Sequence, residues 1–309
     1  MDDFIFLLFV TLLIHGAYGL GVMRRTKKML RTQMAHYERR LHIMAHSLYA
    51  PLGSIQNFTE LLGSEKIQKD KNKVAEYIDI IDDNVVRMLE TLRYYIDISR
   101  IENNAFAIFV RDYSLPAVVE ERLHFYGSRA FKSSVSLKMH IGKGLPPKME
   151  FDSHAVSNMI DRLLSCMIER SKADDTVTLR VFYIPSGETF ASAAKESGIV
   201  CSLPEELPQL LSDQNKIVVL INSSRDIFEQ HEMQTMFDGA IQDLVFPDTN
   251  ELTLQALART HRVGLMVVKR FAEAHGGTAG AFNCKEGSSI YFTLQQIETT
   301  GNDMIHAWK

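Results

Sequence analysis

Apolar residues recur at alternating steps of three and four positions along two stretches of the chain. The first stretch carries them at Leu30, Met34, Tyr37, Leu41, Met44, Leu48, Pro51, Ile55, Phe58 and Leu62. The second carries them at Val74, Ile78, Ile81, Val85, Met88, Leu92 and Tyr95, after a polar break over residues 63–73. Such steps form a heptad seam, which predicts two helices paired as an antiparallel hairpin. Because one hairpin leaves an apolar face uncovered, we expect a homodimer that forms a four-helix bundle.

After Asn104 the pattern changes to a mixture of short helical and strand periods. It predicts helices over residues 117–132, 156–168 and 264–275, and strands over residues 135–141, 176–183, 216–222 and 288–294. Gly276 and Gly277 are expected to end the last helix. Residues 185–215 fit this pattern poorly and are interpreted as an insertion with one or two short helices. The fold class is therefore α+β.

The first 23 residues predict a membrane anchor. Residues 4–23 are largely apolar, and twenty helical residues match a hydrocarbon core about 30 Å thick. Acidic residues precede this run, and five cations follow it at Arg24, Arg25, Lys27, Lys28 and Arg31. Because positive residues stay in the cytoplasm, we expect a single pass through the inner (cytoplasmic) membrane, with the N-terminus outside and the domains cytoplasmic. A cleaved signal peptide would carry its positive charge before the apolar run.

Composition narrows the class of protein further. The chain has 309 residues, of which 46% are hydrophobic and 23% charged, and this balance supports folded domains with real cores. Its net charge of -4 gives no reason to expect nucleic-acid binding. The three cysteines are too few and too widely spaced for a disulfide framework or a zinc site. We divide the chain into an anchor (1–23), a linker helix with the hairpin (24–104), a mixed domain (105–298) and a tail (299–309).

His46 is the first candidate for chemistry. It lies two residues from both Met44 and Leu48, which are seam positions, and thus roughly 200° away from the seam. The imidazole is therefore expected to face solvent. Pro51 removes one backbone hydrogen bond and should bend the helix just after this site.

The segments 46–52, 54–55 and 60–62 resemble the phospho-acceptor box of sensor histidine kinases. Residues 95–102 resemble the end of the second hairpin helix in the same family. The resemblance implies that His46 is the phospho-acceptor and that the mixed domain is an α/β sandwich of the histidine-kinase ATPase type. It further implies ATP and Mg²⁺ as cofactors, and a response regulator receiver domain or a partner histidine kinase as partner.

Two neighbours of His46 depart from the family pattern. The family has an acid directly after the histidine, which acts as a general base, and this position holds Ser47. Three residues further on, the family has a hydroxyl or amide that positions water, and this position holds Ala50. His46 keeps an imidazole that can accept phosphate from another donor.

The resemblance also places the metal site. The two asparagine positions of the family's Mg²⁺-binding helix fall on Arg162 and Cys166, and the nearby lysine position falls on Glu169. Mg²⁺ prefers oxygen ligands, so neither the cation nor the thiol suits it. Glu169 or Ser165 remains as a substitute ligand.

Four positions are implied to contact ATP, namely Asn222, Phe237, Gly264 and Leu265. Asn222 replaces the aspartate that reads adenine, and Ser224 and Asp226 replace glycines after it. Phe237 precedes the expected lid. Gly264 and Leu265 belong to a turn that opens a helix and cradles phosphates with free N–H groups.

Three functions stay open at this point. The core positions fit the family whereas the nucleotide-binding and metal-binding positions differ, which favours a kinase-like scaffold or phosphorelay partner with weak or no kinase activity. The alternative is a divergent kinase that uses Asn222, Gly264 and a substitute metal ligand to phosphorylate His46. The third is an adaptor that uses the hairpin for dimerisation alone.

Overall fold

The computed structural model describes residues 2–196, 214–237, 254–284 and 287–296, except for some helical side chains, chiefly before Gly21 and at residues 254–261. It divides into two compact units, one up to Tyr95 and the other from Ile96 onward. In the part of the chain whose side chains are described, no helix is both long and apolar enough to cross a bilayer. Most side chains of the expected anchor lie outside that part.

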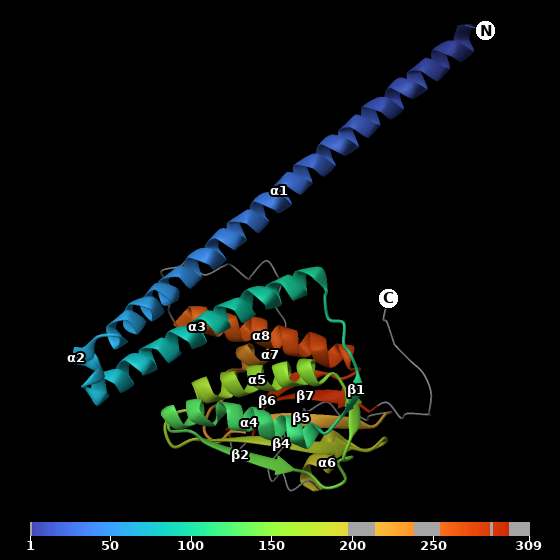
Figure 1. Cartoon of the computed structure of the whole chain (residues 1–309). Coiled ribbons are helices and arrows are strands. Elements are labelled where there is room, and N and C mark those ends of the chain that lie inside the picture. Colours follow the sequence, from blue (N-terminus) through green and yellow to red (C-terminus); the bar gives the residue numbers. More distant parts are fainter. Residues whose placement is uncertain (1, 197–213, 238–253, 285–286, 297–309) are drawn as a thin grey trace. The chain divides into compact units, whose positions relative to one another are not determined.

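The first unit is a helical hairpin, as the heptad pattern predicts. Helix α1 covers Asp2–Leu62, α2 covers Glu65–Gln68 and α3 covers Lys71–Asn103, whose last turns belong to the second unit. Two contacts fix the antiparallel pairing of α1 and α3 (Figure 1). The amide of Asn84 donates to the hydroxyl of Ser54 at 3.2 Å, and the rings of Phe58 and Tyr77 pack edge to face with centroids 5.0 Å apart.

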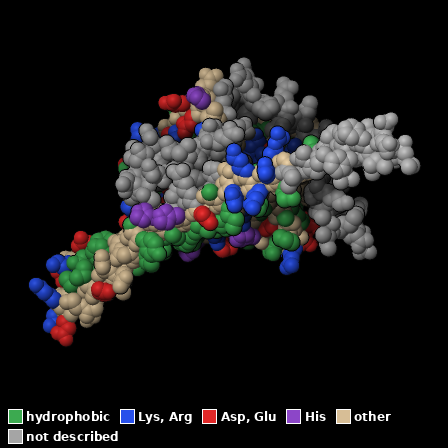
Figure 2. Space-filling view, turned by 90° about the horizontal axis from the view of Figure 1, so that it is seen from above, with side chains coloured by type: hydrophobic (Ala, Val, Ile, Leu, Met, Phe, Trp, Pro, Cys, Tyr) green, Lys and Arg blue, Asp and Glu red, His purple; other side chains and the backbone are tan. Residues whose placement is uncertain are grey.

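Apolar seam residues of the hairpin remain accessible in the single chain. Leu41, Ile78 and Val85 are 43%, 53% and 40% exposed. Figure 2 shows apolar side chains gathered along the helical part of the molecule. This surface is the one that a second hairpin would cover, and the homodimer stays a prediction.

The second unit contains a five-stranded sheet with the strand order β2-β4-β5-β7-β6. Strands β2 and β4 are parallel and the other neighbours are antiparallel. The strands are β2 (Ser136–Ile141), β4 (Thr176–Ile184), β5 (Lys216–Ser223), β6 (Ala279–Cys284) and β7 (Gly287–Gln295). A separate ribbon pairs β1 (Arg111–Tyr113) with β3 (Met149–Phe151).

Helices cover both faces of this sheet. One face packs against α4 (Leu115–Lys132), α5 (Ser153–Arg170) and α8 (Leu254–Ala274), and the other packs against α6 (Phe190–Glu196), as Figure 1 shows. The short helix α7 (Gln230–Thr235) follows β5. Strand β5 explains the two layers, because alternate residues face opposite sides. Val219 joins the core under α5 and Val218 joins the core under α6. The expected α/β sandwich is confirmed.

Most predicted elements are found within one to three residues of their expected ends. One boundary is wrong: we expected a helix to begin at Gly264, but α8 begins at Leu254. Gly264 serves a different purpose inside this helix. A Cβ there would lie 3.1 Å from Nη1 of Arg162, so glycine makes room for the Arg162 side chain. The strands β1, β3 and β6 were not predicted.

Gly276 and Gly277 end α8 as expected. Gly276 has φ +70°, in the left-handed region that favours glycine. A Cβ on Gly277 would lie 1.8 Å from the carbonyl oxygen of Thr293 in β7. The insertion predicted over residues 185–215 contains α6, and its residues 197–213 lie outside the described part of the chain.

Candidate functional site

His46 lies exposed on α1, as its place between seam residues predicts. The side chain that follows it is held on its own helix, because the Ser47 hydroxyl donates to the carbonyl oxygen of Met44 at 2.8 Å. The Tyr95 hydroxyl of α3 also hydrogen-bonds with Ser47. Burial raises the pKa of Tyr95, and the bond to Ser47 acts in the opposite direction. Ser47 therefore connects the two hairpin helices beside His46, and it has no ionisable group to take a proton from the imidazole.

The four positions implied to contact ATP are all buried. Asn222 is 6% exposed at the end of β5, and its Nδ2 donates to the Ser288 carbonyl oxygen at 3.0 Å and to the Ser289 hydroxyl at 3.1 Å. The amide nitrogen thus bonds to β7, and it also donates to Sγ of Cys284 in β6 at 3.8 Å. Phe237 is 7% exposed and belongs to the core. The lid expected directly after Phe237 lies outside the described residues.

Gly264 and Leu265 do not open a helix. Both lie in the interior of α8, where a backbone N–H bonds to the carbonyl one turn earlier. The expected turn with free N–H groups is therefore corrected to continuous helix, because the helical pattern runs back to Leu254.

Arg162 is turned into a buried ion pair. Its Nη2 donates to Oδ1 of Asp97 in α3 at 2.7 Å, and its Nε donates to Oδ1 of Asn158 at 2.9 Å. The Asp97 side chain is 2% exposed and the Arg162 side chain is 12% exposed. A cation therefore occupies the first position implied to help bind Mg²⁺, and it is held there by a carboxylate.

The other metal positions also fail to fit Mg²⁺. Cys166 is buried, and burial raises the pKa of its thiol to about 12. The carboxylate of Glu169 bonds with Arg129 of α4 and accepts from the Ser165 hydroxyl at 3.2 Å. In the described part of the chain, no cluster of three or more His, Cys, Asp or Glu side chains is placed to hold a metal ion.

Arg170 organises a charged cluster that the sequence analysis missed. It lies at the end of α5, and its Nε donates to Oδ2 of Asp226 at 2.7 Å while its Nη1 donates to Oε1 of Glu232 at 2.7 Å. Its guanidinium also lies 4.7 Å from the ring centroid of Phe228. The Ser288 hydroxyl completes the cluster by donating to Asp226 at 3.3 Å.

Electrostatics within the cluster favour the charged form of Arg170. Burial alone would lower the pKa of Arg170, but the hydrogen bond to Asp226 and the charges of Asp226 and Glu232 raise it above its usual value. Asp226 stands where the resemblance implies a glycine close to nucleotide. Its carboxylate is instead bound by a guanidinium of the same domain. An acid at a position where the resemblance implies glycine was the one signal in the sequence for a nearby cation.

Comparison with known proteins agrees with a helical hairpin followed by a mixed α/β domain. Residues 38–104 match the family model of the His Kinase A (phospho-acceptor) domain. No curated protein matches the chain.

Solved structures resemble the chain at low sequence identity. Full-length ShkA in complex with AMPPNP has a TM-score of 0.52 and 12% identity, over 84% of this chain and 46% of ShkA. The histidine kinase AdeS of Acinetobacter baumannii has a TM-score of 0.43 and 14% identity, over 82% of this chain and 98% of AdeS. The histidine kinase ThkA in complex with the response regulator protein TrrA has a TM-score of 0.46 and 13% identity, over 88% and 65% of the two chains. The likeness to ShkA establishes the fold.

Proposed function

We propose that this chain, which carries a His Kinase A phospho-acceptor domain ahead of a domain with the histidine kinase catalytic fold, is a two-component signalling protein that acts as a scaffold or phosphorelay partner. In this proposal its own domain transfers little or no phosphate from ATP. The partner is the receiver domain of a response regulator or a second histidine kinase. The scaffold role, the low kinase activity and the partner are proposed in addition to the domain assignment and the fold.

The pairing of Arg162 with Asp97 is the observation that carries this proposal. A guanidinium at the implied metal position repels Mg²⁺ and uses its donors on a carboxylate that is 2% exposed. Moving Arg162 aside to admit a metal would leave Asp97 buried without its cation, a change that costs several kcal/mol, on the order of 3–5. ATP without Mg²⁺ lacks the ion that neutralises its phosphates.

The cluster around Arg170 supports the same conclusion. A nucleotide near Asp226 would bring phosphate charge toward a carboxylate, and it would compete with Asp226 and Glu232 for the guanidinium. Those bonds are 2.7 Å long, and the three side chains are at most 36% exposed. These ion pairs support a domain that folds without nucleotide.

His46 retains the role of phosphate acceptor in this proposal. An exposed imidazole near neutral pH is nucleophilic at its unprotonated nitrogen. With the acyl phosphate of a receiver aspartate as donor, a nitrogen of His46 attacks phosphorus. The N–P bond forms as the P–O bond to the departing carboxylate breaks, so no nucleotide is required.

Two further parts of the proposal concern location and assembly. We assign residues 1–23 as a single-pass anchor in the inner membrane, because the sequence places a long apolar run before a cationic cluster. The exposed seam residues of the hairpin support a homodimer. Membrane fractionation and analytical ultracentrifugation of residues 24–309 test these assignments: the fragment should be soluble and dimeric.

Titration calorimetry of residues 24–309 with millimolar Mg·ATP tests the central claim. We expect no heat of binding, no transfer of label from radioactive ATP, and transfer to His46 from a phosphorylated receiver domain. The His46→Gln variant is the control for the last step. Binding heat with labelling of His46 by ATP would establish the divergent kinase instead, a reading favoured by the fold shared with AMPPNP-bound ShkA. Absence of association with both a receiver domain and a partner histidine kinase would favour the adaptor.

A further inference from the structure

Four exposed cations of α1 share one face of the helix. We name them the cationic stripe, and they are Arg24, Lys27, Lys28 and Arg31. The last three follow the first by three, four and seven positions, so at about 100° per residue all four fall within an arc of roughly 100°. Helix α1 is continuous through this stretch, as Figure 1 shows.

The positive charge of the stripe is not balanced by its surroundings. No Asp or Glu occurs between Asp3 and Glu38, although the whole chain has a net charge of -4. Within the part of the chain that the structure describes, none of the four side chains forms an ion pair or a side-chain hydrogen bond. Like charges four residues apart on a helix repel one another, and the stripe contains two such pairs. An anionic partner relieves this repulsion.

The apolar seam of α1 stops where the stripe begins. The seam starts at Leu30, and its alternating steps would place the preceding apolar residue at position 27, which is Lys27. The neighbouring hydroxyls of Thr26 and Thr32 donate to carbonyl oxygens of their own helix, both at 3.0 Å. Helix pairing therefore has no apolar contact at this level of α1, and the long cationic side chains are left to meet another partner.

We propose that the cationic stripe binds anionic phospholipid headgroups at the surface of a bilayer. The inference rests on the proposed anchor at residues 1–23 for the nearness of that bilayer, and it does not depend on phosphotransfer or on ATP. At 1.5 Å per residue, the stripe ends about 12 Å along α1 from the end of the anchor. The field of an anionic surface extends about 8 Å at physiological ionic strength, and Lys and Arg side chains reach several Å further. The whole stripe is thus within reach of the headgroups.

The chemistry of the four side chains suits phosphate. A guanidinium can donate two parallel hydrogen bonds to phosphate oxygens, and an ammonium binds them as a point charge. Each Lys or Arg close to an anionic surface increases the affinity by about fivefold. Because the four lie on one face, they can bind several headgroups together, and α1 then meets the bilayer surface with this face.

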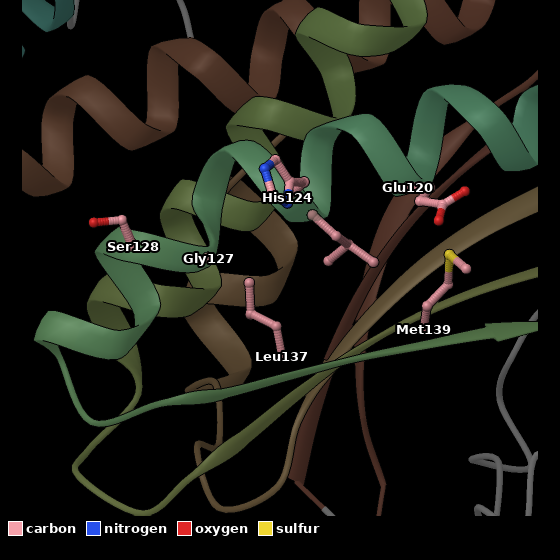
Figure 3. Close-up of a pocket in the computed structure, with 7 residues that line it drawn as sticks. Glu120, His124, Gly127, Ser128, Leu137 and Met139 are labelled. Carbon is pink, nitrogen blue, oxygen red and sulfur yellow. The ribbon is translucent and has the colours of Figure 1, made fainter.

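The hollow between α4 and β2 is unsuited to the same partner. Figure 3 shows it in the second unit, with Leu137 and Met139 on the strand and Glu120 on the helix. The strand side is apolar, and the carboxylate of Glu120 repels lipid phosphate. The stripe, by contrast, presents four cations.

Acylation of lysines in the full chain, reconstituted into lipid nanodiscs, tests the proposal. One set of discs contains phosphatidylcholine alone, and the other adds about 30% phosphatidylserine. We expect the reporter lysines, Lys27 and Lys28, to react about threefold more slowly in the anionic discs, as measured by mass spectrometry, and about 0.5 M salt should remove this protection by screening. Lys66 and Lys69 are exposed near the hairpin turn and should react equally in both discs.

The double variant Arg24→Gln and Arg31→Gln halves the charge of the stripe and keeps both reporter lysines. Glutamine has nearly the helix propensity of arginine, so α1 is retained. We expect the reporter lysines to lose most of their protection. Arg87→Gln with Arg93→Gln removes the same charge from exposed positions of α3 and should leave the protection unchanged. Protection that survives the loss of Arg24 and Arg31 would overturn the proposal, because a general surface potential would then slow the reaction.

Equal labelling in the two kinds of disc would also overturn the proposal, in favour of an acidic protein partner. Failure of the anchor gives a different result, since the chain would then not float with vesicles of phosphatidylcholine alone. In that case, salt-sensitive flotation with vesicles that contain phosphatidylserine, lost in the double variant of the stripe, would support headgroup binding. Absence of such flotation would overturn it.

Discussion

The guanidinium of Arg162 in α5 donates to the carboxylate of Asp97 in α3 over 2.7 Å, and both side chains are largely buried. The two residues are 65 positions apart in the chain. Their pairing joins the last turns of α3 to the sheet-covering helices of the second unit. It also places a guanidinium at the implied metal position.

Arg162→Ala should destabilise the protein strongly, because it leaves Asp97 buried without its cation. We expect a loss of about 3–5 kcal/mol in the free energy of unfolding, measured by urea denaturation of residues 24–309. The matched control is Arg270→Ala. Arg270 pairs with Glu273 on the surface of α8, and exposed pairs contribute about 0–1 kcal/mol. Equal losses for the two variants would contradict the assignment of Arg162 as a buried structural ion.

Restoring individual motif residues should not create a kinase. In the double variant Ser47→Glu and Cys166→Asn, we expect no label on His46 after incubation with radioactive ATP. The physical reason is that Arg162 and Asp226 remain in their ion pairs. Labelling of His46 in this variant, absent when His46→Gln is added, would mean that these ion pairs open readily to admit Mg·ATP.

His275 should make stability depend on pH. Its Nε2 accepts from the backbone N–H of Asp152 at 3.2 Å, so its Nδ1 carries the proton that bonds the Phe271 carbonyl at 2.7 Å. Burial lowers the pKa of His275 in the folded state, although the Phe271 bond and the charge of Asp152 act in the opposite direction. A lowered pKa means that the unfolded chain binds the proton more readily.

The stabilisation from His275 is therefore present above about pH 6.5, the unfolded pKa, and is lost as pH falls toward the folded pKa. Urea unfolding of the wild type and of His275→Gln should show a stability difference that shrinks between pH 7.5 and pH 5.5. A difference that grows on acidification would show that the imidazole is charged in the fold.

Cys166 should resist alkylation while the protein is folded. Its thiol is buried with a pKa of about 12, so almost none is thiolate near neutral pH. Iodoacetamide treatment followed by mass spectrometry should leave Cys166 unmodified in the native protein and modify it in urea. Cys284, which is partly exposed, serves as the internal comparison. Rapid native labelling of Cys166 would indicate that α5 opens locally.

Gly277→Ala should be destabilising through overpacking, since its Cβ would lie 1.8 Å from the Thr293 carbonyl oxygen. We expect a loss of about 1–3 kcal/mol in the free energy of unfolding. Gly127→Ala is the paired control, because it adds the same atom inside a helix with nothing within 4 Å. That change should stabilise the protein by up to about 1 kcal/mol. Thermal unfolding of the two variants should therefore shift in opposite directions.

The sequence predicts the hairpin and the exposure of His46 well, because heptad periodicity spans whole helices. It predicts the buried strands β4, β5 and β7 for a similar reason, since long apolar runs identify them. Strands β1 and β3 have three residues each, too few for a period to emerge. The small residues of β6 also give a weak strand signal.

The candidate site was predictable only in part. Compared with the motifs of the family that the chain resembles, Arg162 and Asp226 are unusual at their positions. Spacing along the chain does not predict which side chains they form ion pairs with. Arg170 lies 56 residues from Asp226 and 62 from Glu232, and only the folded chain brings them together. The sequence predicts a helix start at Gly264 because glycine is common in turns, whereas in α8 this glycine gives clearance to the Arg162 side chain.

The ion pair of Arg162 with Asp97 has a consequence for how such a chain can change over generations. Replacing Arg162 alone with asparagine leaves the Asp97 carboxylate buried without its ion-pair partner. Replacing Asp97 alone leaves the Arg162 guanidinium without its partner. Either single step lowers stability before any metal ligand is gained. Single substitutions at either position are therefore opposed by stability, and the two residues are expected to change together or not at all.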